Sequence, residues 1–129
     1  LAAASAALPV AGQQRPFTVV ASRSHLSDET RAFIDALRTS HPAMAMMSRG
    51  SSLKMCMVAE GLADVYPRFA PTMEWDTAAG HAIATAAGCE VVRADDGTPL
   101  AYNKPDLHNP WFIVRRKDGH ATTPYAHEL

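Results

Sequence analysis

The stretch 17–48, FTVVASRSHLSDETRAFIDALRTSHPAMAMMS, decides the expected fold. It begins with a β-branched run at 17–21 that is typical of a buried strand, and it ends with a second apolar run at 43–48. Between the two runs, Ser27 is a good helix N-cap and apolar side chains recur at helical spacing over about 28–39. Strand, helix and strand in this order predict two parallel strands joined by a right-handed crossover.

The alternation of strand and helix continues after this unit. The pattern predicts a helix over about 51–60, a strand at 62–66, a loop at 67–74, a helix over 75–87 and strands at 90–94, 99–102 and 111–114. Gly61 and Gly88 follow the two helices, in the position where a left-handed conformation is common. The fold class is therefore α/β, with a mostly parallel sheet, helices on both faces and a closing pair of strands that can be antiparallel.

Length and composition exclude several classes of protein. The 129 residues suit one domain, and 12 Lys+Arg against 13 Asp+Glu leave no basic field for a nucleic-acid polymer. Cys56 and Cys89 are the two cysteines and form no CxxC motif, which argues against a disulfide framework or a cysteine-rich zinc site. This cysteine usage favours a cytoplasmic protein.

The apolar segment at 1–12 is shorter than a membrane span, contains Pro9 and carries no basic n-region of the kind that a signal peptide needs. Because the sequence begins with Leu1, we expect it to be cut from a longer polypeptide. Residues 1–16 are then a non-native start or a linker, 17–115 the folded unit and 116–129 a polar tail.

Three segments are expected at the carboxyl ends of the first three strands, where open α/β sheets bind ligands. They are His25, the GSSLK segment at 50–54, and Trp75 with Asp76. The histidine can donate to an anion, or its ring can be satisfied by the backbone of its loop. Sequence order alone predicts that these segments meet at one edge of the sheet.

The GSSLK segment begins a helix with a lysine in its first turn. A cation there opposes the helix dipole at a cost of about 0.3–1 kcal/mol, whereas a bound anion would reverse the sign of that cost. Free amide groups, the hydroxyls of Ser51 and Ser52 and the Lys54 ammonium would together hold a phosphate. The alternative is a serine-capped helix with a solvated lysine.

Two charged residues carry similar alternatives. Asp76 either caps its helix or holds a hard cation such as Mg²⁺, and the small residues at 78–80 would let the helix pack tightly. Arg68 either makes bidentate hydrogen bonds to phosphate oxygens or pairs with Asp64. The DDGT segment at 95–98 is interpreted as a turn between two strands.

Several segments together resemble one enzyme family. SRSH at 22–25, GSSLK at 50–54, AEGLADVYPRF at 59–69 and WDTAAGH at 75–81 occur in order, and LAYN at 100–103 and NPWF at 109–112 continue the likeness. They are similar to the C-terminal half of the CysQ-type 3′(2′),5′-bisphosphate nucleotidases, within the inositol monophosphatase superfamily of Mg²⁺-dependent phosphatases. WDTAAG marks the superfamily, whereas SRSH and YPRF point to the nucleotidase branch.

The resemblance implies the C-terminal half of an αβαβα sandwich and a hydrolase that converts adenosine 3′,5′-bisphosphate into AMP and phosphate. The sulfated analogue would be a further substrate, which links the protein to sulfate assimilation. By the same resemblance Asp76 is a catalytic residue and a Mg²⁺ ligand. The residues implied to bind substrate are His25, Ser51, Ser52, Lys54, Arg68 and Thr77. The alternatives are an inositol monophosphatase and a non-catalytic module that binds a nucleotide or phosphate.

The sequence also departs from the family pattern. The other metal ligands of the superfamily belong to an N-terminal half, in a helical glutamate, a Glu-Glu pair and a D-P-x-D-G-T segment that this sequence lacks. The DDGT at 95–98 has no proline and follows WDTAAG instead of preceding it. We therefore expect the missing half as a partner, little Mg²⁺ binding or hydrolysis by this chain alone, and self-association through exposed apolar surface. The protein is expected in the cytoplasm, where peripheral attachment to the inner face of the cell membrane is a further expectation.

Overall fold

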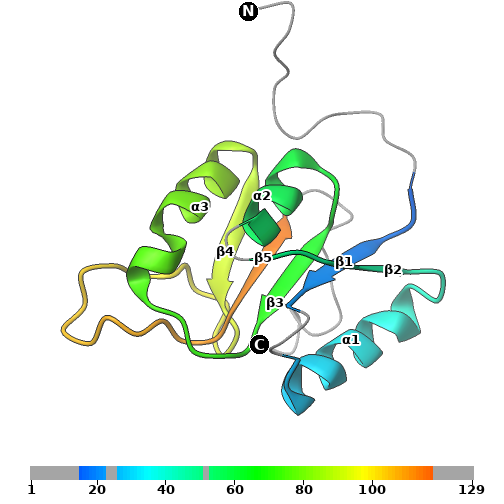
Figure 1. Ribbon diagram of the computed structural model, residues 1–129, viewed down its shortest axis with the longest axis horizontal. Helices are drawn as coiled ribbons and strands as arrows, with labels where there is room; N and C mark the ends of the chain where they lie inside the picture. The colour runs from blue at the N-terminus through cyan, green and yellow to red at the C-terminus, as the bar shows by residue number, and fades with distance from the viewer. Residues whose placement is uncertain (1–14, 23–25, 51–52, 118–129) are drawn as a thin grey trace, which may run out of the picture.

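The computed structural model describes residues 15–22, 26–50 and 53–117, which form an α/β fold as expected (Figure 1). The elements are β1 (Thr18–Ala21), α1 (Asp28–Ser40), β2 (Ala45–Ser48), α2 (Leu53–Glu60), β3 (Val65–Arg68), α3 (Glu74–Ala86), β4 (Cys89–Arg93) and β5 (Phe112–Arg116). The strand predicted at 99–102 is wrong, because that segment makes only an isolated bridge between Pro99 and Val92. No helix of the described residues is long and apolar enough for a membrane span.

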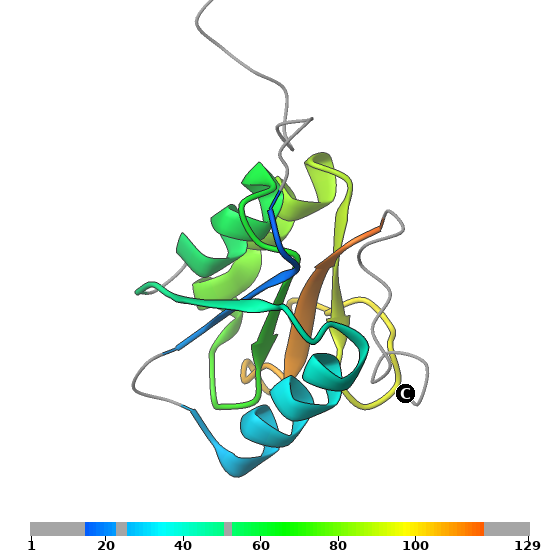
Figure 2. The same cartoon turned by 90° about the vertical axis from the view of Figure 1, so that its right-hand side faces the viewer.

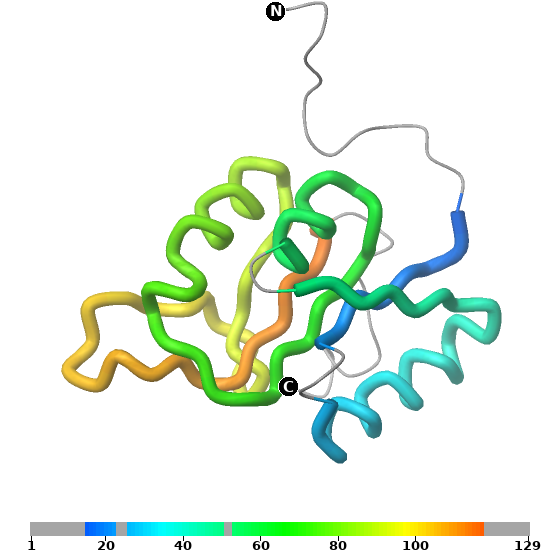
Figure 3. Tube along the Cα trace, viewed as in Figure 1, coloured from blue at the N-terminus to red at the C-terminus, as the bar shows by residue number. Residues whose placement is uncertain are grey.

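The five described strands form one mixed sheet in the order β2-β1-β3-β5-β4. Strand β1 pairs in parallel with β2 and β3, whereas β5 is antiparallel to both β3 and β4. Four strands therefore point the same way, in agreement with the expected mostly parallel sheet that closes with an antiparallel pair, and only β5 is antiparallel. The reason is the connection at 94–111, which stays near the edge where β4 ends, so that the next strand must run back across the sheet (Figure 3).

Successive side chains on each strand point to opposite faces, so the sheet carries two cores. Val20, Tyr66 and Val114 belong to the cluster with α2 and α3, and their chain neighbours Val19, Val65 and Ile113 to the cluster with α1. Helices thus cover both faces, as the sequence predicts (Figures 1 and 2).

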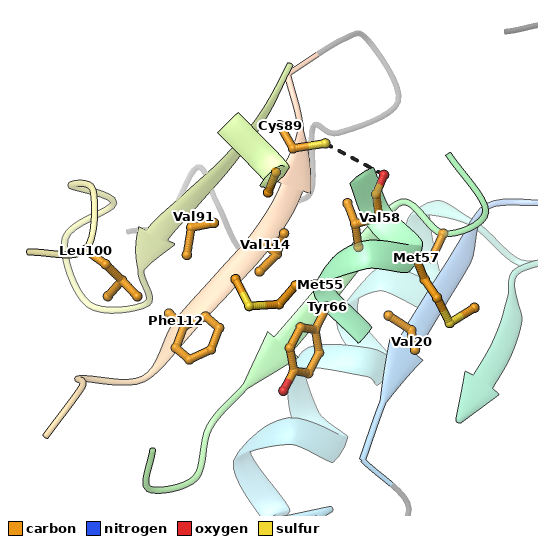
Figure 4. Packing of buried hydrophobic residues seen from close by; sticks show 12 residues of the cluster. Val20, Met55, Met57, Val58, Tyr66, Cys89, Val91, Leu100, Phe112 and Val114 are labelled. Carbon is orange, nitrogen blue, oxygen red and sulfur yellow. Dashed lines mark hydrogen bonds between the residues drawn. The ribbon is translucent and has the colours of Figure 1, made fainter. Parts of the chain in front are cut away.

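Helices α2 and α3 lie side by side on one face and make close contact at Gly80. A Cβ atom at this position would stand 2.7 Å from the Met55 sulfur and 3.3 Å from the Met55 Cβ. Met55 is 2% exposed and lies among Tyr66, Phe112 and Val114 (Figure 4). Because these neighbours leave Met55 little room to retreat, Gly80 sets how closely the two helices approach.

Replacing Gly80 by valine is expected to destabilise the chain by about 1–3 kcal/mol, the usual cost of overpacking. Valine at the exposed Ala78 on the same helix changes only helix propensity, about 0.6 kcal/mol, and is the matched control. Urea unfolding of both variants measures the difference. The double variant Gly80→Val with Met55→Ala should recover part of the loss, and equal effects at the two positions would show that no close contact exists.

Candidate functional site

The carboxyl ends of β1, β2 and β3 lie at one edge of the sheet, because the three strands are parallel. Helix α2 follows β2 from this edge, and α3 follows β3 after a short loop. Lys54 and Arg68 therefore come from segments that meet there. The sequence predicts this position for the segment that contains Lys54. His25, Ser51 and Ser52 lie outside the described residues, so their assignment to this edge stays a prediction.

Lys54 is not the solvated lysine of the simpler sequence interpretation, because it is only 3% exposed. Its Nζ donates a hydrogen bond to the Arg49 carbonyl at 3.0 Å and lies 5.6 Å from the centroid of the Tyr66 ring. Burial lowers the pKa of the Lys54 ammonium, and the positive charge of Arg68 lowers it further. The protein thus holds a cation in a place that disfavours its charge.

Arg68 ends β3 and contributes the second positive charge at this edge. Its Nη2 donates to the Pro71 carbonyl at 3.4 Å, while its buried Nε has no hydrogen-bond partner among the described residues. The alternative pairing with Asp64 is wrong. Asp64 lies just before the opposite end of β3, where it forms an ion pair with Arg15 at 2.6 Å and accepts the Thr18 amide at 2.8 Å.

Lys54 and Arg68 stand near each other with no carboxylate paired to either within the described part of the chain. Tyr66 supplies no negative charge, because burial raises the pKa of its hydroxyl to about 12 although the Arg68 charge acts in the opposite direction. Two neighbouring cations without a counter-charge attract an anion. An anion with several oxygens, such as a phosphate, suits the guanidinium and the ammonium together.

Asp76 lies in the first turn of α3 and is exposed. Its Oδ2 accepts the amide hydrogen of Met73, the N-cap residue, at 2.9 Å. The carboxylate therefore caps its helix from the third helical position. Capping of the helix and binding of a cation, the two alternatives that the sequence leaves for Asp76, are compatible. Its other oxygen makes no hydrogen bond with any described residue and is free to bind a cation.

The described residues contain no group of three or more His, Cys, Asp or Glu side chains that could hold a metal ion. Asp76 offers one hard oxygen ligand of the kind that Mg²⁺ prefers. Glu74, two residues earlier, is committed elsewhere, because its carboxylate accepts the Asn103 amide at 2.6 Å and pairs with Lys104. The donor set fits part of a magnesium site, so further ligands must come from residues other than those described.

Thr77 is 1% exposed, and its hydroxyl is fully engaged inside the fold. The hydroxyl donates to the Glu74 carbonyl at 3.2 Å and accepts from Asn109 Nδ2 at 3.0 Å and Tyr102 at 3.3 Å. In this arrangement it is not open to a ligand, and its contact with substrate stays a prediction. Asn109 and Tyr102 lie in the segments at 100–103 and 109–112 that carry the family likeness, but no chemical pattern marked their role in advance.

The DDGT segment at 95–98 forms a turn, as expected. Gly97 adopts φ 73° and donates its amide hydrogen to the Arg93 carbonyl at 3.0 Å. The Arg93 guanidinium holds the pKa of Asp95 down to about 2, and Asp96 accepts from the Thr98 hydroxyl at 2.7 Å. Both carboxylates are therefore engaged locally, Asp95 with the end of β4 and Asp96 within the turn.

Comparison with known proteins gives a consistent result. The model of the inositol monophosphatase family matches residues 7–129. The 3′(2′),5′-bisphosphate nucleotidases CysQ of Salmonella typhimurium and Escherichia coli are 56% and 48% identical over 101 residues, which is 78% of this chain and 39% of each relative. The crystal structure of CysQ from Bacteroides thetaiotaomicron superposes with a TM-score of 0.81 at 61% identity, covering 85% of this chain and 41% of that one.

The Salmonella typhimurium and Escherichia coli relatives are named as bisphosphate nucleotidases, and the Bacteroides thetaiotaomicron structure is named as a bacterial member of the inositol monophosphatase family. The chain spans about two fifths of the length of each. The family match extends over nearly the whole sequence, and the similarity in sequence and in fold points to the same group of proteins. The chain therefore belongs to the inositol monophosphatase family.

Proposed function

We propose that this chain provides the nucleotide-binding half of a phosphatase that removes the 3′-phosphate of adenosine 3′,5′-bisphosphate, giving AMP and phosphate. The names of its relatives support this reaction. The observation that carries the proposal is the pair of neighbouring cations Lys54 and Arg68, which has no carboxylate partner among the described residues. Such a pair suits a substrate with two phosphate groups.

In this proposal the ammonium and guanidinium groups hold phosphate oxygens, and His25, Ser51 and Ser52 complete the phosphate site. Because Lys54 is buried, its ion pair with a phosphate would be screened little by solvent and would gain strength. The bound anion would also stabilise the charged ammonium and offset the effect of burial on its pKa. Thr77 would contact the substrate only after its hydroxyl left the present hydrogen bonds.

Enzymes of this family are generally metal-dependent. We propose Asp76 as one Mg²⁺ ligand, through the oxygen that Met73 does not use. When bound, Mg²⁺ activates a water molecule and stabilises the leaving oxygen. The contribution of this chain is to direct the Asp76 carboxylate and to hold the phosphorylated substrate beside it.

In this proposal the folded unit at 17–115 is about half of the active enzyme. The remaining metal ligands come from a segment similar to the part of the CysQ relatives that this chain does not match. We infer that the chain alone turns over little substrate. Association of two copies through exposed apolar side chains, such as Trp75 at 67% exposure, and a cytoplasmic location belong to the same proposal.

Two other functions remain distinguishable by experiment. Hydrolysis of inositol monophosphate fits the family as a whole. A binding module without catalysis is favoured by the lack of a three-ligand metal cluster in the described ranges. Turnover of the two substrates by a complete enzyme separates all three possibilities.

Replacing Lys54 by methionine is expected to weaken the binding of adenosine 3′,5′-bisphosphate to this chain by about tenfold to a hundredfold. This range corresponds to the loss of one charge-assisted hydrogen bond, about 1.5–3 kcal/mol. Methionine keeps most of the buried volume, so the fold should persist. Isothermal titration calorimetry measures the affinity, with the exposed Arg38→Met in α1 as the control. Unchanged affinity in Lys54→Met would contradict the proposed phosphate site.

A chimera tests catalysis in a complete enzyme. The 101 matched residues of the Salmonella typhimurium CysQ are replaced by those of this chain. We expect Mg²⁺-dependent release of phosphate from adenosine 3′,5′-bisphosphate and slower release from inositol monophosphate. Asp76→Asn should lower kcat by at least about a hundredfold, as expected when an electrostatic group at the reacting centre is lost.

The exposed Asp95→Asn serves as the matched control in the chimera, because the Asp95 carboxylate is paired with Arg93, at the end of β4 beside the turn. It should leave kcat unchanged. This chain by itself should give no turnover above background in the same assay. Full activity of Asp76→Asn would remove Asp76 from the mechanism, and efficient hydrolysis by the isolated chain would refute the requirement for another half.

A further inference from the structure

A short segment of the 94–111 connection pairs with the residues that lead into α3. Met73 and His108 form an isolated antiparallel bridge. On either side of it, the Glu74 amide donates to the Leu107 carbonyl at 2.9 Å and the Asn109 amide to the Thr72 carbonyl at 2.9 Å. The entrance to α3 is thus held by the backbone at 107–109.

The side chain of Asn109 reinforces this pairing from inside. It is 7% exposed, and its Nδ2 lies 2.9 Å from the Met73 carbonyl oxygen and 3.0 Å from the Thr77 hydroxyl. One amide group therefore joins the residue before α3 to the first turn of α3. A neutral amide donor can do this without adding charge near Asp76.

Met73 connects Asn109 to Asp76. Its amide hydrogen is donated to Asp76 Oδ2 at 2.9 Å, and its carbonyl accepts from Asn109 Nδ2 at 2.9 Å. Rotation of the backbone at Met73 would displace the partner of the Asp76 carboxylate. Because Asn109 restrains the Met73 carbonyl, it also restrains the direction in which Asp76 presents its free oxygen.

Two further contacts hold the same connection along α3. The Glu74 carboxylate accepts the amides of Asn103 and Lys104, at 2.6 and 3.3 Å. The Tyr102 hydroxyl lies 2.7 Å from His81 Nδ1, one turn further along the helix from Thr77. These bonds fix the position of 102–109 relative to α3, so that Asn109 acts from a rigid support.

We propose that Asn109 is a positioning residue for Asp76, which keeps the free carboxylate oxygen directed toward a metal ion. The inference rests on the proposed function, in which Asp76 is a Mg²⁺ ligand. Groups that orient a metal ligand typically change metal affinity or activity by about 10–100-fold when they are removed. Asn109 touches neither substrate nor metal in this role.

The test compares Asn109→Ala with His108→Ala. His108 is the preceding residue, its side chain is 63% exposed and its ring bonds to Asp106. Removal of that ring leaves the backbone pairing in place. Asn109→Asp is the second variant, because it keeps the size of the side chain but replaces the amide donor with an acceptor.

The first readout does not depend on activity. Amide hydrogen exchange is measured on this chain, and the Met73 amide should exchange at least about tenfold faster in Asn109→Ala and in Asn109→Asp. The amides of β3 and β5 should keep their rates, as should the Met73 amide in His108→Ala. An unchanged Met73 rate in both Asn109 variants, or equal acceleration throughout the sheet, would overturn the inference.

The second readout uses the chimera. The Mg²⁺ concentration for half-maximal activity should rise by about 10–100-fold in the Asn109 variants, with less than about a threefold change in KM for the nucleotide at saturating Mg²⁺. An unchanged Mg²⁺ requirement with active Asn109 variants overturns the positioning role. If neither variant folds, Asn109 is required for folding and the inference is likewise overturned.

Failure of the proposed function gives a different pattern. If the chimera is inactive, or if Asp76→Asn has no effect on it, the proposed function fails and Asn109 cannot position a metal ligand. Hydrogen exchange then still reports whether Asn109 restrains Met73. If Asp76→Asn abolishes activity while Asn109→Ala leaves the Mg²⁺ requirement as it was, only the further inference fails.

Discussion

The close approach of α2 and α3 at Gly80 is the constraint on which the candidate site depends. Because Gly80 has no side chain, α3 lies against Met55, the residue after Lys54. Asp76 stands one helical turn before Gly80 on the same helix. The contact thus fixes how the beginning of α3, with its carboxylate, is placed relative to the beginning of α2, with its buried ammonium.

The sheet supplies the second condition, since three parallel strands end at the same edge and bring cations from different segments together. A buried Lys54 beside Arg68 is unfavourable in the protein alone, as the lowered pKa of the lysine indicates. Structural charges are normally compensated, as Asp64 is by Arg15 at the other end of β3. The contrast between the two ends of one strand is the physical basis for assigning the anion site to the carboxyl end.

The connection at 94–111 gives the site its third support. It contains no regular strand among the described residues, yet it is bonded to α3 through Asn109, Tyr102 and the partners of Glu74. A long irregular segment of this kind is commonly functional. Here its polar side chains hold the first turns of the helix that carries Asp76, so the segment belongs to the site although it need not touch a ligand.

The sequence by itself determined the α/β class, all eight described elements to within about three residues, and the position of Lys54 at the carboxyl edge of the parallel strands, because hydrophobic periodicity, caps and strand order are local signals. It wrongly predicted a strand at 99–102 and left the partner of Asp64 open. Only the tertiary structure decided that β5 runs between β3 and β4, that Thr77 is enclosed and that Asn109 holds Met73. These features depend on contacts between residues 19 to 50 positions apart, and such contacts leave no pattern in neighbouring residues.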